Sequence, residues 1–206
     1  MENLIVKGGW VMAPILLGSI VALTLVLERL LFLFRIRLDV PKFSSGIFSL
    51  IKRGNLKEAE EICQTTRHPL AAVFRTGLEH AGEEASEIER IMEREGNRQV
   101  QKAERNLNYL VVIIGVEPLL GFLGTILGLI KAFMAWEHFS TSVTVSQLAA
   151  GIYQAMITTA AGLAIAIPYF VIYNILLGKV NTITQDLNHY SDEFVGILKK
   201  AGQRAR

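Results

Sequence analysis

The sequence contains few of the residues that build disulfide, metal or hydrolytic sites. Its single cysteine, Cys63, cannot form an internal disulfide bond and lies at no metal-ligand spacing from a histidine. We interpret it as a small residue on a helix rather than a redox group. The four histidines are scattered outside the apolar stretches, and no H-E-x-x-H, G-x-S-x-G or phosphate-loop motif is present. We therefore expect no enzymatic activity, no bound metal and no cofactor.

The chain also carries little net charge. Its 21 Lys and Arg residues nearly balance 19 Asp and Glu residues, and the resulting formal charge of +2 gives no reason to expect a nucleic-acid partner. Hydrophobic residues, by contrast, make up 51% of the chain, and they occur in bunches rather than at a helical or strand period. Bunching of this kind is typical of a chain whose solvent is membrane lipid.

Three apolar stretches are long enough to cross a bilayer, so the sequence predicts an all-α membrane protein with three transmembrane helices. About 20 residues are needed to cross ~30 Å of hydrocarbon, and the three stretches lie at residues 10–34, 109–136 and 151–178. Residues 1–34 comprise a short N-terminal segment and the first of these stretches. We interpret this stretch as an uncleaved span rather than a signal peptide. A polar external loop is expected at 137–150. Pro168 should kink the third helix mildly.

The distribution of basic residues predicts the orientation of the chain. Residues 35–108 hold 13 of the 21 Lys and Arg residues, residues 179–206 hold five, and the loop at 137–150 holds none. Because basic residues accumulate on the cytoplasmic side, we expect the C-terminus in the cytoplasm and the N-terminus in the periplasm. The chain would then be a multi-pass protein of the bacterial inner membrane.

The cytoplasmic segments are predicted to be mostly helical. A turn at 53–55 separates the start of this region from helices at 56–66 and 69–81. Ser86 and Glu89 fit a capping box that opens a charged helix, and we expect that helix to run unbroken into the second span. The third span should likewise continue as a helix into the tail at 179–206, so that two helices extend far into the cytoplasm. These extensions are either a stiffening bundle or a docking surface for other proteins.

Small residues dominate the second and third spans, which indicates close helix packing in lipid. The glycines expected at the packing surface are Gly121, Gly124, Gly128 and Gly162.

Polar residues share these surfaces. Glu117, Gly121 and Thr125 are spaced i, i+4 and i+8 and so lie on one helix face. Gln154, Thr158 and Thr159 add polar groups to the third span. A carboxylate facing lipid costs ~3 kcal/mol or more at mid-bilayer, which favours an interior surface that is either hydrated or lined by protein. Two alternatives stay open at this point: the threonines bond back to their own helix, and Glu117 is a structural carboxyl group.

Two segments in these spans resemble the MotA/TolQ/ExbB proton-channel family. They are GVEPLLGFLGTILGLIKAF (115–133) and GIYQAMITTAAGLAIAIPYFVIYN (151–174), in this order and spacing. The resemblance implies a homo-oligomeric, pentameric ring in the inner membrane, with the second and third spans lining its lumen. It implies a dimer of an ExbD- or TolR-like single-span partner inside the ring and a TonB- or TolA-like protein beyond it. Thr125 and Thr159 fall on the pore threonines of the family.

The sequence departs from the family at one position. ExbB-like members often carry glutamate where this chain has Gln154, and glutamine cannot carry a proton as a carboxyl group does. Our hypothesis is that an aspartate of the partner is the main proton carrier. Glu117, ~12 Å along the helix from Thr125 on the cytoplasmic side, would help protons leave toward the cytoplasm.

The resemblance predicts a function as an ion-conducting stator subunit of an inner-membrane motor. Such a motor couples the proton-motive force to mechanical work on a periplasmic or outer-membrane process, as in ExbB-like, TonB-dependent transport. A TolQ-like role in envelope maintenance, a gliding-motility motor and a non-conducting membrane scaffold are the alternatives. The sequence does not decide between H⁺ and Na⁺ as the ion.

Overall fold

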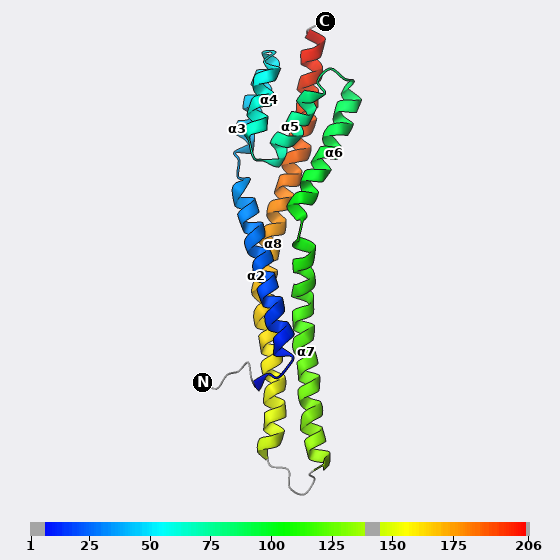
Figure 1. The fold of residues 1–206 in the computed structure, drawn as a ribbon. Helices are drawn as coiled ribbons and strands as arrows, with labels where there is room; N and C mark the ends of the chain where they lie inside the picture. Colours follow the sequence, from blue (N-terminus) through cyan, green and yellow to red (C-terminus); the bar gives the residue numbers. More distant parts are fainter. Residues whose placement is uncertain (1–6, 139–144, 205–206) are drawn as a thin grey trace. The chain divides into compact units, whose positions relative to one another are not determined.

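The computed structural model describes residues 7–138 and 145–204, and every regular element within them is a helix (Figure 1). Three helical stretches are long and apolar enough to cross a membrane, judged by length and composition. The first is α2, Met12–Arg35. The second, Ala85–Glu137, includes all but the last residue of α7, Leu107–His138, and the third, Leu148–Ala201, lies within α8, Val145–Arg204. The chain divides into two compact units, which are described in turn.

The first unit comprises residues 1–28 and 106–175 and therefore contains most of α2, all of α7 and the first half of α8. Large apolar side chains cover much of its surface, among them Leu119 and Phe122 on α7 and Ile167 on α8, each more than 60% exposed. A surface of this composition is stable in lipid or against other apolar helices but not in water. α8 passes through Pro168 without interruption. The predicted loop at 137–150 lies in part outside the described residues.

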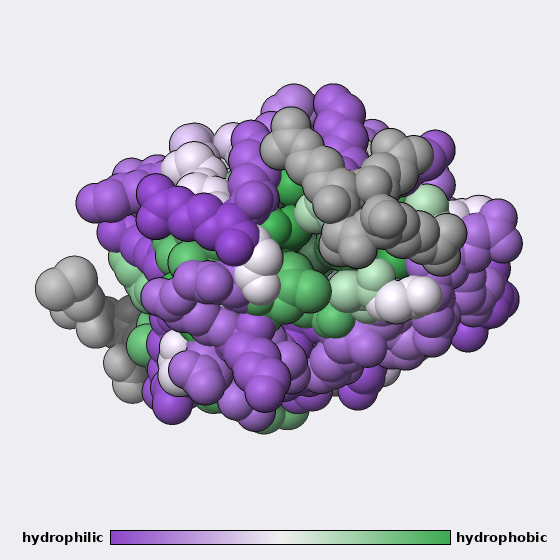
Figure 2. Space-filling model, turned by 90° about the horizontal axis from the view of Figure 1, so that it is seen from above, coloured by the Kyte–Doolittle hydropathy of each residue, from purple (hydrophilic) through white to green (hydrophobic). Residues whose placement is uncertain are grey.

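The second unit comprises residues 29–105 and 176–206. Its helices are α3, Val40–Lys52; α4, Leu56–Thr65; α5, Pro69–Glu79; and α6, Ala85–Glu104, together with the ends of α2 and α8. The aromatic ring of Phe74 lies at its centre, with ring centroids at 5.6 Å from Phe48 and 4.7 Å from Phe194. A view from above shows a mainly hydrophilic face with a small hydrophobic area within it (Figure 2).

Short polar caps set the boundaries of the helices in the second unit. Asp39 accepts a hydrogen bond from the Lys42 amide at 3.3 Å, and the His68 ring accepts one from the Leu70 amide at 3.2 Å. Gly54 adopts φ 82°, a conformation that glycine reaches without strain, and it forms the turn between α3 and α4. The turn at 53–55 and the two helices after it are confirmed to within two residues.

The predicted unbroken helix from α6 into α7 is wrong. α6 ends at Glu104, and Asn106 takes φ 70°, a left-handed conformation that asparagine tolerates better than most residues. In the second unit, the Arg29 guanidinium donates to the Lys102 and Ala103 carbonyl oxygens at 2.9 and 3.3 Å, which satisfies two carbonyls at the end of α6. In the first unit, the Asn106 side chain donates to Glu28 at 3.1 Å.

The predicted capping box at Ser86 is also wrong. α6 begins one residue earlier, at Ala85, and its N-cap residue is Glu84, which makes no capping hydrogen bond through its side chain. The Glu84 carbonyl accepts from the Glu87 and Ile88 amides instead, at 2.9 and 3.0 Å. One side of this charged helix is apolar, since Ile88 and Met92 are buried.

Candidate functional site

The candidate site lies in the first unit, where α7 and α8 approach closely through glycines. A Cβ atom added to Gly128 would lie 2.7 Å from the Gly151 carbonyl oxygen, and one added to Gly162 would lie 2.6 Å from that of Glu117. Both distances are below any ordinary van der Waals contact, so only glycine fits at these two positions. A Cβ added to Gly121 would lie 3.0 Å from the Thr158 carbonyl oxygen on α8, and one added to Gly124 would overlap the Thr158 side chain. The two backbones therefore hold the polar side chains between them within hydrogen-bonding reach.

The hydroxyl groups of Thr125 and Thr159 meet across this contact. They are hydrogen-bonded to each other, Thr159 donates to the Gly121 carbonyl at 3.0 Å, and Thr125 lies 3.2 Å from the Ala155 carbonyl. Both side chains are half-buried. Since a hydroxyl group donates one hydrogen bond and accepts up to two, this pair can still accept hydrogen bonds from water or from a partner side chain.

Thr158 has a different environment from its neighbour. It is fully buried, and its hydroxyl donates to the Ala155 carbonyl of its own helix at 2.9 Å. This is the back-bonded geometry typical of threonine in a helix, and the side chain packs against Gly124. In the single chain, Thr158 thus contributes packing.

Glu117 lies on α7 two turns from Thr125 and is only 2% exposed. One carboxylate oxygen lies against Gly18 of α2, so closely that any Cβ at Gly18 would overlap it. The other, Oε2, is buried and has no hydrogen-bond partner among the described residues. Because a carboxyl group can take up and release a proton, this unpartnered oxygen is a candidate proton site.

Gln154 is held by hydrogen bonds at both ends of its side-chain amide. Its carbonyl oxygen accepts from Lys131 of α7 at 3.4 Å, and its amide nitrogen donates to the Gly8 carbonyl at 3.3 Å. It lines a cavity of about 690 Å³ together with Lys7, Lys131 and Tyr153. Gln154 is therefore separate from the Thr125–Thr159 pair and has basic neighbours.

The structure thus brings Thr125 and Thr159 together and gives Glu117 and Gln154 separate surroundings. Sequence reasoning missed the contribution of α2. Gly18 of this helix contacts Glu117, and the Ser19 carbonyl accepts a hydrogen bond from the Tyr169 hydroxyl at 3.1 Å. The one available signal was that Gly18 is the only glycine in α2. In the described part of the chain, no three His, Cys, Asp or Glu side chains gather in a way that could hold a metal ion.

Comparison with known proteins shows that this site lies within a segment that matches a known family. The family described as the MotA/TolQ/ExbB proton channel family matches residues 65–189, which include α7 and the part of α8 that carries the site residues. A Tol-Pal system protein TolQ from Haemophilus influenzae is 38% identical over 104 residues, or 50% of this chain and 45% of that protein. A putative biopolymer transport protein, ExbB-like 1, from Synechocystis is 32% identical over 190 residues, or 90% and 72%. Biopolymer transport protein exbB1 of Vibrio cholerae is 53% identical over 60 residues, 29% and 26% of the two chains.

Proposed function

We propose, from the premise that the chain belongs to the MotA/TolQ/ExbB proton channel family, that it is the ion-conducting stator subunit of an inner-membrane motor. In this proposal the proton-motive force is converted into mechanical work on a periplasmic or outer-membrane process, with no enzymatic step. The observation that carries the proposal is the Thr125–Thr159 pair, two half-buried hydroxyl groups joined between membrane-length helices.

The proposed assembly is a pentameric ring around two single-span helices of an ExbD- or TolR-like partner. α7 and α8 would line the lumen, where the exposed side of the Thr125–Thr159 pair would accept a hydrogen bond from the protonated aspartate of the partner. The excess of basic residues in 35–108 and 179–206 supports a cytoplasmic location for those segments and a periplasmic N-terminus. A TonB- or TolA-like protein would receive the work.

Glu117 is proposed to pass protons from the lumen to the cytoplasmic side. It lies on the same helix as Thr125, ~12 Å farther toward the end at which α7 begins. Its unpartnered Oε2 supports this role, because a purely structural carboxyl group would be expected to have both oxygens hydrogen-bonded. Gln154 cannot take up and release a proton as a carboxyl group does. Its hydrogen bonds to Lys131 and Gly8 support a role in positioning those two residues.

A TolQ-like role in envelope maintenance is the second candidate. The similarity to a TolQ protein at 38% identity supports it, whereas the ExbB-like relative covers more of the chain. Both roles use the same ion path, so the proposed site is common to them.

The proposal is tested by ion flux in liposomes that contain the chain and a co-expressed single-span partner. With an imposed pH gradient and an internal pH dye, Thr159→Val should lower the proton flux by about tenfold or more, because it removes a hydrogen-bonding group from the path. Thr24→Val is the matched control, since Thr24 is exposed on α2 and its hydroxyl donates to the Ile20 carbonyl of its own helix. Full flux in Thr159→Val would overturn the site, and no flux in the wild type would favour a scaffold.

The same liposomes test Glu117 and the identity of the ion. Glu117→Gln keeps the size of the side chain but removes its ability to carry a proton, so proton flux should fall although the ring still forms. If Glu117→Gln conducts as the wild type does, Glu117 is only structural. An imposed Na⁺ gradient at equal pH, read with a sodium dye, should produce no flux if the ion is H⁺.

A further inference from the structure

A second cavity, outside the ion-path site, lies wholly in the second unit and has a volume of about 660 Å³. Three parts of the chain line it: the end of α2 with the segment after it, the start of α5, and α8 just beyond the third predicted span. None of its lining residues belongs to the Thr125–Thr159 pair or to Glu117. Its position next to the ends of two membrane helices raises the question of what occupies it.

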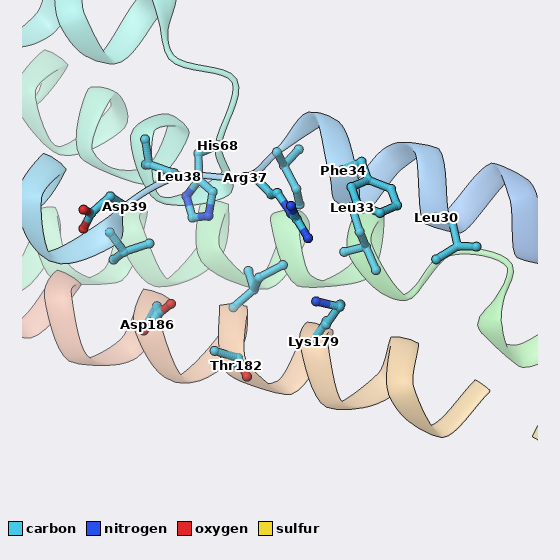
Figure 3. Close-up of a pocket in the computed structure, with 13 residues that line it drawn as sticks. Leu30, Leu33, Phe34, Arg37, Leu38, Asp39, His68, Lys179, Thr182 and Asp186 are labelled. Carbon is cyan, nitrogen blue, oxygen red and sulfur yellow. The ribbon is translucent and has the colours of Figure 1, made fainter. Parts of the chain in front are cut away.

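The order of the side chains along this cavity is informative (Figure 3). Leu30, Leu33 and Phe34 occupy one end, and Arg37 and Lys179 follow in the middle. Asp39 and Asp186 lie at the other end, near His68. The charged side chains along the cavity therefore change from cationic to anionic with distance from the apolar end, with Leu38 beside Asp39 at the far end.

The apolar end belongs to the membrane. Leu30, Leu33 and Phe34 are among the last apolar residues of α2, the first of the membrane-length helices. Hydrocarbon chains of a lipid bury against such side chains in the bilayer core.

The cationic middle lies at the membrane boundary. Arg37 follows the end of α2 by two residues, and Lys179 follows the third predicted span directly. Both are exposed, and neither has an ion-pair partner in the described part of the chain. The Arg37 guanidinium lies over the Phe34 ring at 4.7 Å, which orients its donors. Two such cations at this depth suit a phosphate group.

The anionic end would repel a second phosphate and suits an ammonium group. Asp39 uses one oxygen to cap α3. Asp186 is partly buried, and that burial raises its pKa, with nearby His189 acting in the opposite direction. A cationic group beside Asp186 would offset the cost of burying its negative charge.

We propose that this cavity binds a phospholipid with a phosphoethanolamine headgroup. Its acyl chains would lie along Leu30, Leu33 and Phe34, its phosphate would bind Arg37 and Lys179, and its ammonium would donate to Asp39 and Asp186. The lipid belongs to the leaflet on the side of the second unit. A purely anionic headgroup would leave the two carboxylates without a partner, and a choline headgroup has no N–H to donate to them.

The test is native mass spectrometry of the full-length chain, released from micelles with phosphatidylethanolamine, phosphatidylglycerol or phosphatidylcholine of identical acyl chains. The wild type should retain phosphatidylethanolamine about tenfold more than either of the others, the effect of one charge-assisted hydrogen bond. Equal retention of phosphatidylethanolamine and phosphatidylcholine, or a preference for phosphatidylglycerol, would overturn the proposal.

Two variants locate the site. The double variant Arg37→Gln/Lys179→Gln should lose retained phosphatidylethanolamine by about tenfold or more, whereas Asp186→Asn should lose only the preference over phosphatidylcholine. Arg35→Gln and Asp192→Asn are the matched controls, because neither residue lines the cavity. Unchanged retention in the double variant would mean that the lipid binds elsewhere or that a second copy of the chain fills the cavity.

Discussion

Among single residues, His68 shows how burial and capping act together. It is 8% exposed, and its ring nitrogen accepts a hydrogen bond from the Leu70 amide at the start of α5. Only the neutral ring can accept at that nitrogen. Burial lowers the pKa of His68 from 6.5 to about 4. The cap and the desolvation therefore both favour the uncharged imidazole.

This environment predicts a pH dependence of stability. Between pH 6.5 and 4 the unfolded chain binds a proton at His68 that the folded chain does not, so the free energy of unfolding falls as the pH falls, by up to about 3 kcal/mol. His68→Asn keeps a capping side chain but removes the titration. Chemical unfolding of the full chain in micelles at pH 7 and pH 4.5 should show a smaller loss in His68→Asn than in the wild type. Equal losses would contradict the assignment.

The site residues show which features of the site can be predicted from the spacing of residues along a helix. The i, i+4, i+8 spacing predicts that Glu117 and Thr125 share one side of α7, and the small residues indicated where α8 would approach. Spacing gives the face of a helix but not the identity of its neighbour. Contact of Glu117 with Gly18 depends on how α2 packs, and an apolar helix offers many equivalent faces for that.

At the scale of helices, the α7–α8 contact predicts which glycines tolerate a methyl group. Gly162→Ala would bring Cβ to 2.6 Å from the Glu117 carbonyl oxygen, and backbone atoms cannot move aside cheaply. We expect it to lower the free energy of unfolding by about 1–3 kcal/mol. Gly178→Ala, on the same helix with no atom within 4 Å, should be neutral or stabilising by up to about 1 kcal/mol. Thermal unfolding of the two variants in micelles measures both changes in stability. Similar changes in Gly162→Ala and Gly178→Ala would contradict the close α7–α8 contact at Gly162.

The break between α6 and α7 could not be predicted from the local sequence. No glycine or proline stands at residues 105 and 106, so local propensity favoured one long helix. The break is stabilised by side chains from far along the chain: Arg29 on the carbonyls at the end of α6 and Glu28 on Asn106. Contacts across more than 70 residues leave no periodic signal. The uninterrupted α8, by contrast, follows directly from its apolar spacing.

For the whole molecule, the distribution of basic residues is the basis for predicting the orientation of the chain in the membrane. Apolar helices of membrane length do not by themselves say which end faces the cytoplasm, because a helix can insert either way round. The 13 basic residues in 35–108 predict that this segment lies in the cytoplasm. The same argument predicts that the proposed lipid lies in the cytoplasmic leaflet, next to residues 35–108.

A cysteine-accessibility experiment tests this orientation. The native Cys63 is 3% exposed and burial raises its pKa to about 12, so it should not react with a membrane-impermeant maleimide until the chain unfolds. In a Cys63→Ala background, Glu137→Cys at the exposed end of α7 should be labelled in intact spheroplasts. Ser45→Cys, on an exposed position of α3, should be labelled only in inverted vesicles.

Each single-cysteine variant is the control for the other. Labelling of each variant from one side of the membrane shows that the reagent is active and that the introduced cysteine is accessible. Labelling of Ser45→Cys in intact spheroplasts would reverse the orientation. It would also put Glu117 on the periplasmic side of Thr125, where it could help protons enter but not leave. The proposed ring and the threonine pair would be unaffected by that result, since neither depends on which way the chain is inserted. The topology experiment thus separates the direction of proton movement through Glu117 from the existence of the path itself.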